Sequence, residues 1–121
     1  MQSKIKNEIG AIVIENEVIA RIAGLAAMEC YGVVGMAAKR IRDGIVQLLR
    51  MESLSKGVVL KTLEEGELVI ELHIIVDYGT NLTAIAETLQ SNVRYKVEDS
   101  VGMPVREVNI FIEGIRTEQG V

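Results

Sequence analysis

The chain has 121 residues, of which 49% are hydrophobic, and it carries a formal net charge of −4 with a pI near 5.0. This length fits one domain, residues 1–121, with a core of its own. The acidic balance argues against a general nucleic-acid binder, which usually presents a basic face. Because the aromatic residues are three Tyr and one Phe, the core must be aliphatic.

Sequence features also bear on the compartment. Cys30 is the single cysteine, so no internal disulfide is expected, which fits a reducing cytoplasm. No window holds eighteen uncharged apolar residues, and the N-terminus lacks an apolar signal core. We therefore expect neither a membrane span nor secretion.

The first pattern in chain order is the nearly all-apolar run of residues 9–14. Residues 1–8 are polar and predict a loose start, whereas the apolar run predicts a strand buried on both faces. Asn16 is placed to cap a helix over residues 17–30, whose apolar side chains form one broad stripe. Gly32 is expected to end this helix as a left-handed cap.

A short strand is predicted at residues 33–36, followed by a segment, residues 37–56, that carries conflicting signals. Its apolar residues are spaced for a helix, but Gly44 interrupts the pattern at a cost of about 1 kcal/mol relative to Ala. We expect a variable helical or Ω-like excursion that packs on the sheet edge or forms a contact surface; a solvated basic loop is the alternative. The candidate interaction residues here are Lys39, Arg40, Arg42, Leu48 and Leu49.

The chain is organised around residues 68–101, which predict a long strand, a tight turn and a long amphipathic helix. The strand at residues 57–63 and the turn after it predict an antiparallel hairpin with this long strand. Gly79 permits a positive φ, and Thr80 or Asn81 can cap the helix that starts near Leu82. Gly102 then breaks the chain before the next strand.

Residues 105–115 alternate as a closing strand, and residues 116–121 predict a frayed tail. A strand–helix–strand crossover makes its two strands parallel, and the hairpin adds an antiparallel neighbour. We therefore predict an α+β two-layer sandwich, a mixed sheet with two long helices on one face and the variable helical segment between the halves.

Three residues could carry chemistry, and each has a structural explanation. His73 lies near Glu71, and Lys61 is a second candidate neighbour across the hairpin. A single His without a further His or Cys offers no transition-metal site. Cys30 sits on an apolar helix stripe, as an inert buried thiol would. Asp77, at a strand end, fits turn chemistry and capping better than cation binding. We expect no catalytic, metal or cofactor-binding residues.

With these elements in place, the chain resembles the alkaline shock, or Gls-type, envelope stress response family of Gram-positive bacteria. The segments that carry the resemblance are GAIVIENEVIARIAGLAAMECYGVVGM, SKGVVL, VDYGTNLTAIAETLQSNVRYKVEDSVGMPV and VNIFIEGI. The family offers no catalytic residues to carry over. Its motif positions are backbone and packing residues: Gly32, Val33, Gly79, Asn81, Gly102 and Gly114.

The resemblance implies a small cytoplasmic protein that is not an enzyme. Some members are held at the membrane by a partner with transmembrane segments, and one branch is linked to control of fatty-acid synthesis. The subgroup with a VxYG-N turn and a final strand ending in EGI, as in this chain, resembles small stand-alone proteins encoded beside a dihydroxyacetone- or fatty-acid-kinase-like protein. We therefore expect a homo-oligomeric interaction or scaffold protein that serves cell-envelope or lipid homeostasis. Its protein partner is expected to be membrane-anchored or kinase-like.

Two other function classes remain as alternatives. A small-molecule sensor, or a regulator of a lipid-metabolism enzyme, would have a pocket near residues 77–81 or the basic loop. A nucleic-acid-binding module would present basic and aromatic residues on its sheet. That match is poor, because the closing strand would offer Glu107, Asn109, Phe111 and Glu113.

Overall fold

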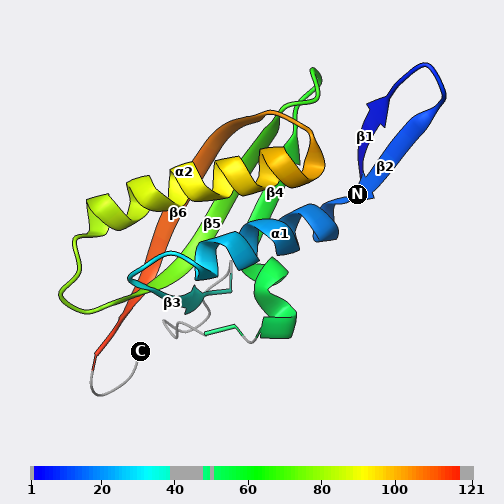
Figure 1. The fold of residues 1–121 in the computed structure, drawn as a ribbon. Helices are drawn as coiled ribbons and strands as arrows, with labels where there is room; N and C mark the ends of the chain where they lie inside the picture. Colours follow the sequence, from blue (N-terminus) through cyan, green and yellow to red (C-terminus); the bar gives the residue numbers. More distant parts are fainter. Residues whose placement is uncertain (1, 39–47, 50, 118–121) are drawn as a thin grey trace.

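The computed structural model describes residues 2–38, 48, 49 and 51–117 (Figure 1). It confirms the predicted α+β class. The elements in chain order are β1 (Gln2–Lys6), β2 (Ala11–Glu15), α1 (Asn16–Met28), β3 (Val33–Met36), the 3-10 helix η1 (Met51–Gly57), β4 (Val58–Thr62), β5 (Leu68–Asp77), α2 (Leu82–Val101) and β6 (Val105–Arg116).

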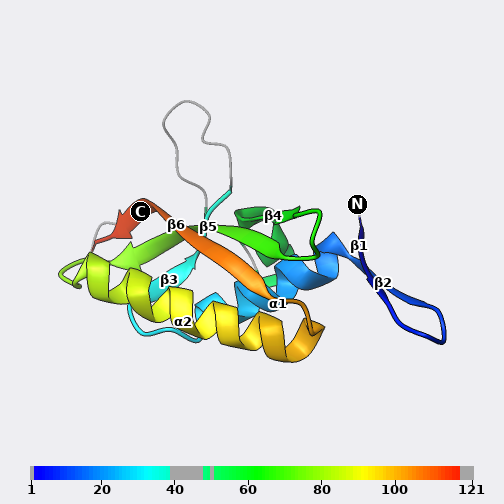
Figure 2. The same cartoon turned by 90° about the horizontal axis from the view of Figure 1, so that it is seen from above.

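Strand β5 is the centre of the main sheet. It pairs antiparallel with β4 and then with β3 along one side, and parallel with β6 along the other (Figure 1). The parallel β5–β6 pair confirms the predicted crossover through α2, and the β4–β5 pair confirms the predicted hairpin. Both long helices lie on one face of this sheet (Figure 2), so the two-layer arrangement is also confirmed.

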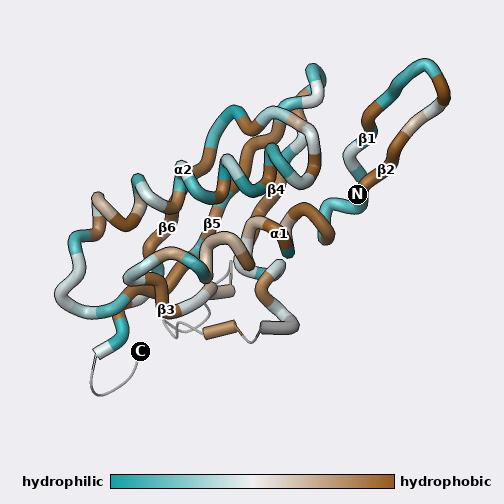
Figure 3. Tube along the Cα trace, in the orientation of Figure 1, coloured by the Kyte–Doolittle hydropathy of each residue, from teal (hydrophilic) through white to brown (hydrophobic). Residues whose placement is uncertain are grey.

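The core lies between that face and the two helices. Every second residue of β5, from Leu68 to Val76, is fully buried. The stripe of α2 covers them, and α1 adds small residues that let the two helices approach closely. Along α2 hydrophobic and hydrophilic positions alternate, whereas β5 is largely hydrophobic (Figure 3). The α2 residues that this packing buries are Ile85, Leu89, Val93, Val97 and Val101.

Helix α2 has a defined cap at each end. The Asn81 side-chain oxygen accepts a hydrogen bond from the Ala84 backbone N–H at 3.0 Å. Gly102 has a φ of 79° and donates its N–H to the Glu98 carbonyl at 2.9 Å. Both groups satisfy backbone atoms that the helix itself leaves unpaired.

Helix α1 begins and ends at other residues than the sequence predicted. Asn16 is its first residue, and its side-chain oxygen accepts from the Ser3 hydroxyl at 3.2 Å instead of from a helical N–H. The helix stops at Met28, with Glu29 as the C-cap in the right-handed region. Gly32, with a φ of 88°, therefore lies further on, in the turn into β3.

Gly32 and Gly79 form a matched pair for a stability prediction. Both have φ above +80°, where an L side chain costs roughly 1–2 kcal/mol. A Cβ at Gly32 would also meet Ile85 Cδ1 at 2.6 Å, whereas at Gly79 no atom lies within 4 Å. We expect Gly79→Ala to lower the unfolding free energy by about 1 kcal/mol and Gly32→Ala by more. Urea denaturation measures both, and equal losses would contradict the close approach of Ile85 to Gly32.

The N-terminal region differs most from the prediction. Residues 2–6 are a strand rather than a loose start, and they pair with β2 in a ribbon that projects from the body (Figures 1 and 2). The run of residues 9–14 is not buried on both faces: Ile9 is 98% exposed and Ile12 is 50% exposed. The Ser3 hydroxyl, 2.9 Å from the Thr62 hydroxyl, anchors the base of the ribbon. An apolar run alone does not distinguish a core strand from such a ribbon.

Of the predicted helical segment of residues 37–56, the structure describes residues 37, 38, 48, 49 and 51–56. Among these, the helical residues belong to η1, which places Leu54 in the core beside Gly24. Leu48 is not on a helix, since it forms an antiparallel bridge with Ala37. Leu49 donates its backbone N–H to the Met36 carbonyl at 2.8 Å. The chain at these two residues therefore extends beside β3.

Candidate interaction surface

The face of the main sheet opposite α1 and α2 is the candidate interaction surface, and we call it the outer sheet face. Neither long helix covers it, because both lie on the other side (Figure 2). Alternation along the strands assigns side chains to it. Its residues on β4, β5 and β6 include Val59, Lys61, Val69, Glu71, His73, Glu107, Asn109, Phe111 and Glu113. Ile75, the next residue of β5 on this face, is fully buried.

His73 is at the centre of this face and is buried, with 5% of its surface exposed. Its Nδ1 lies 2.5 Å from Glu113 Oε2, and its Nε2 lies 2.7 Å from Glu71 Oε2. Ionised carboxylate oxygens only accept hydrogen bonds, and a neutral imidazole has a single N–H. Each ring nitrogen of His73 therefore has a carboxylate oxygen as its hydrogen-bond partner, and the tautomer determines which contact is a donated hydrogen bond.

Phe111 covers this network from β6. It lies opposite His73 in the parallel register, and the two rings stack with centroids 4.9 Å apart and an interplanar angle of 15°. Phe111 remains 44% exposed. The outer sheet face thus carries a rigid, partly exposed aromatic ring surrounded by carboxylates.

The sequence revealed only part of this cluster. It placed Glu71 beside His73, and it placed Phe111 and Glu113 on the sheet face of the closing strand. It missed the contact of these two residues with His73, about forty residues earlier in the chain. The parallel β5–β6 register is the signal that would have found it. The expected neighbour Lys61 instead lies opposite Val69, four residues along β5 from His73.

The cluster is a closed network rather than an open site. The two His73 nitrogens point to different carboxylates, so the three side chains do not converge on a common point. In residues 2–38, 48, 49 and 51–117, no three His, Cys, Asp or Glu side chains are arranged to hold a metal ion. The cluster can therefore fix the position of Phe111 on the outer sheet face, which is a structural role.

Asp77 is engaged in an exposed ion pair at the end of β5. Its Oδ1 lies 2.9 Å from Arg116 Nη2 and accepts from Arg116 Nε at 3.0 Å. Its carbonyl accepts from the Thr80 hydroxyl at 2.7 Å, which holds the turn before α2. Arg116, expected in a frayed tail, is therefore the last residue of β6 and is held in place.

Cys30 is buried at the end of the α1 region, where α2 packs against it. Its thiol donates to the Ala26 carbonyl at 3.7 Å, and Asn92 Nδ2 lies 3.6 Å from its sulfur. Desolvation by burial raises the pKa of the Cys30 thiol, and the hydrogen bond from Asn92 opposes this only in part. A protonated, buried thiol is a poor nucleophile.

We predict that Cys30 reacts slowly with a thiol reagent in the native protein. At pH 8 the rate with DTNB should be at least about tenfold lower than in denaturant, because both thiolate fraction and access are reduced. Since the folded pKa is raised, the stability from the protonated thiol is present below the unfolded pKa and is lost as pH rises through the folded pKa. Cys30→Ala should flatten this alkaline loss; equal rates in both states would contradict burial of the thiol.

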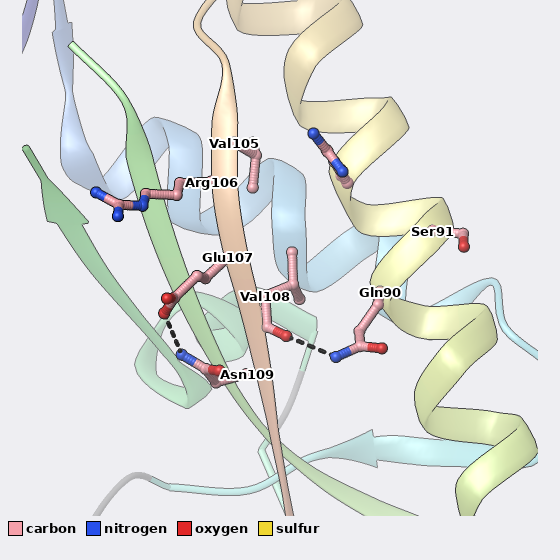
Figure 4. Close-up of a pocket in the computed structure, with 8 residues that line it drawn as sticks. Gln90, Ser91, Val105, Arg106, Glu107, Val108 and Asn109 are labelled. Atoms are coloured by element: carbon pink, nitrogen blue, oxygen red, sulfur yellow. Dashed lines mark hydrogen bonds between the residues drawn. The ribbon is translucent and has the colours of Figure 1, made fainter. Parts of the chain in front are cut away.

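A second feature of the surface is a groove of about 360 Å³ between α2 and β6 (Figure 4). Gln90, Ser91 and Arg94 line it from α2, and residues 105–109 line it from β6. Gln90 Nε2 donates to the Val108 carbonyl at 3.0 Å across the groove. The groove thus runs beside β6, which pairs with β5 alone among the strands that the structure describes.

Of the candidate residues from the sequence, Lys39, Arg40 and Arg42 lie outside the described residues. Leu48 is 46% exposed and Leu49 is half-buried against the core. Leu48 can therefore contribute apolar surface. In the part of the chain that the structure covers, no helix is long and apolar enough to cross a membrane.

Comparison with known proteins places this chain in a family. The model of the alkaline shock protein family, described as having a cell envelope-related function, matches residues 4–117. The chain is 44% identical over 118 residues to the protein YloU of Bacillus subtilis (strain 168), covering 96% of this chain and 97% of YloU. It is 33% identical over 117 residues to the protein Spy1614 of Streptococcus pyogenes serotype M6, covering 96% of each.

A more distant relative has a functional name. The chain is 24% identical over 110 residues to a stress response regulator gls24 homolog of Streptococcus pyogenes serotype M3, covering 91% of this chain and 61% of that protein. No solved structure matches the chain. The family match spans nearly the whole chain, and YloU is similar from end to end, so the chain belongs to the alkaline shock protein family.

Proposed function

We propose that this protein is a non-enzymatic interaction protein of the cell envelope, and that the outer sheet face binds a partner protein. The observation that carries the proposal is the stack of Phe111 on His73, held between Glu71 and Glu113. Family membership supports the envelope context, and the gls24 homolog supports a link to stress response.

The chemistry of the outer sheet face fits a protein partner. Protein interfaces are enriched in aromatic side chains at their centre and polar groups at the rim. Here the central ring is Phe111, and Asn109 and Glu107 are exposed beside it. Because Phe111 is held by its stack, little side-chain entropy is lost on binding. The neighbouring carboxylates disfavour nucleic acid, whose phosphates they would repel.

The cellular part of the proposal follows from the resemblance. The protein acts in cell-envelope or lipid homeostasis, forms homo-oligomers, and works in the cytoplasm or at the membrane through its partner. The partner is either a protein with transmembrane segments or a kinase-like protein of lipid metabolism. The two differ in where the complex fractionates: the first holds the protein in the membrane pellet, and the second leaves it in the supernatant.

A pull-down from lysate of the native host tests the proposal. The variant Lys61→Glu with Val69→Lys changes the outer sheet face, and the new opposite charges face each other across β4 and β5, which preserves pairing. The control Thr83→Glu with Glu87→Lys makes the same kind of change on the exposed side of α2. We expect the variant to lose a partner that wild type and control retain; identical partners in all three would overturn the proposal.

The basic residues of the 37–56 segment form a second arm of this experiment. We propose Lys39, Arg40 and Arg42 as an additional contact for an acidic partner surface. The variant with all three replaced by Ala should bind the same partner more weakly, and the difference should shrink at high salt. Unchanged binding would remove these residues from the interaction surface.

A further inference from the structure

Within the described residues, strand β6 is paired on one side only. It is a strand of 12 residues, bonded to β5 along its length, and no strand among the described residues pairs with its other side (Figure 1). Long unpaired strand edges present a row of N–H and C=O groups that can pair with another chain. The segment from Asn109 to Ile112 carries no charge and no Pro to prevent this.

The hydrogen bond from Gln90 shows which backbone groups face the open side. Gln90 approaches from α2 and reaches the Val108 carbonyl, so this carbonyl points away from β5 (Figure 4). Because successive residues of a strand direct their backbone groups to alternate sides, Ile110 and Ile112 also direct theirs to the open side. The amide of Gln90 occupies the edge of β6 at Val108. The part of the edge centred on Phe111 is therefore the part left for pairing with another strand.

From this geometry we propose that two copies of the chain join through the open side of β6, antiparallel, with Phe111 on the two-fold axis. The inference rests on the proposed self-association and names the surface that produces it. Ile110 of one copy then pairs with Ile112 of the other, and the reverse, through backbone hydrogen bonds. The same surface serves both copies, so the contact closes as a dimer instead of growing into a filament.

Side-chain chemistry selects this register over its neighbours. A symmetric register centred on Ile110 would place Glu107 opposite the second copy's Glu113, and two carboxylates facing each other are unfavourable. A register centred on Asn109 would place Phe111 opposite Glu107. The register centred on Phe111 pairs the two phenyl rings with each other and places the Asn109 amide, a donor, opposite a Glu113 carboxylate, an acceptor.

The dimer would extend the stacked pair of each copy into a row of four rings, His73 and Phe111 from each chain. Phe111 is 44% exposed although it is the only Phe of the chain. Pairing across the axis would cover the side of the ring that faces the open edge of β6, and its outward surface would stay available to the partner protein. The outer sheet faces of the two copies would then form one continuous surface for the partner protein.

A charge-swap experiment tests the dimer. By size exclusion with light scattering, wild type should be a dimer, and Phe111→Glu and Phe111→Lys should each be monomers, because position 111 faces itself. A 1:1 mixture of the two variants should form dimers again, since opposite charges then meet on the axis. Tyr95→Glu, at an exposed position of α2, is the control and should remain a dimer. Thermal unfolding of each variant verifies that it is folded.

Cross-linking tests the register in a Cys30→Ala background. Directly opposite residues at a non-hydrogen-bonded antiparallel position have Cα atoms about 4.5 Å apart, within reach of a disulfide. Phe111→Cys should therefore form an intermolecular disulfide on oxidation. Asn109→Cys should not form one, because residue 109 of the second copy would lie about four residues further along the strand, roughly 13 Å away.

The outcomes separate this inference from the proposed function. If wild type is a dimer and both Phe111 variants remain dimers, the β6 surface is wrong although self-association stands. If wild type is a monomer, or if the mixed variants stay apart, the inference is overturned. The pull-down with the outer-face variant tests partner binding independently of the dimer. If wild type is a monomer but Lys61→Glu with Val69→Lys still abolishes partner capture, the partner-binding proposal stands.

Discussion

Replacing His73 by leucine is expected to destabilise the protein by about 2 kcal/mol, because it leaves the Glu71 and Glu113 carboxylates facing each other without a donor. Removing one member of a fully buried ion pair costs about 3–5 kcal/mol. The two carboxylates here keep 29% and 19% side-chain exposure, so water offsets part of that loss. Urea denaturation monitored by circular dichroism measures the change.

The control for His73→Leu removes the charges that it leaves behind. In the His73→Leu background, Glu71→Gln with Glu113→Gln should recover roughly half of the lost stability, since two neutral amides do not repel each other. The same two substitutions with His73 present should instead be destabilising. A His73→Leu protein that is as stable as wild type would show that the network of His73 with the two carboxylates does not hold this face.

The second large effect is expected at Leu72, in the centre of the core. Leu72 is fully buried, paired with Val58 of β4 on one side and Ile110 of β6 on the other. Leu→Ala at buried sites costs about 2–5 kcal/mol, depending on how far the cavity collapses. We expect about 3 kcal/mol for Leu72→Ala, measured as a lower urea midpoint with an unchanged slope.

Val69 provides the matched control on the same strand. It lies three residues earlier, so its side chain points to the outer sheet face, where it is half-buried. Val69→Ala should cost no more than about 1 kcal/mol, because less apolar surface is lost from a less buried site. Similar losses from both substitutions would contradict the assignment of one core face and one outer face to β5.

The sequence was most informative where one periodicity continued without interruption. In β5 every second residue from Leu68 to Val76 alternates into the core, and this period of two is visible in the sequence. In α2 the apolar stripe, the Asn81 cap and the Gly102 stop all lie in one continuous segment. Local patterns therefore predicted the layers and the crossover.

Long-range pairing determined what the sequence did not show. Glu113 is the His73 partner that comes from β6. Its place beside His73 is determined by the parallel register and by an irregularity between Ile112 and Gly114. The exposure of Ile9 depends on β1 and β2 pairing with each other instead of joining the main sheet. The local pattern of hydrophobic residues determines which face of a strand is buried. It does not identify which strands pair with each other, nor where an irregularity in that pairing falls.

The turn before α2 has a structural role. The Asp77 ion pair with Arg116, the Thr80 hydrogen bond and the Asn81 cap are all satisfied by neighbouring groups of the chain. The exposed aromatic ring of Phe111 lies elsewhere, on the outer sheet face. Contact with a partner is therefore expected to involve that face rather than the end of the sheet where the turn lies.

Site-specific photocrosslinking in the native host tests the central claim, that the outer sheet face binds a protein partner. A photoreactive residue at position 61 lies on that face, and the same residue at position 83 lies on the exposed side of α2. We predict a discrete adduct with another protein from position 61 and none from position 83. Adducts from position 83 alone, or equally from both positions, would contradict the assignment of the partner to the outer sheet face.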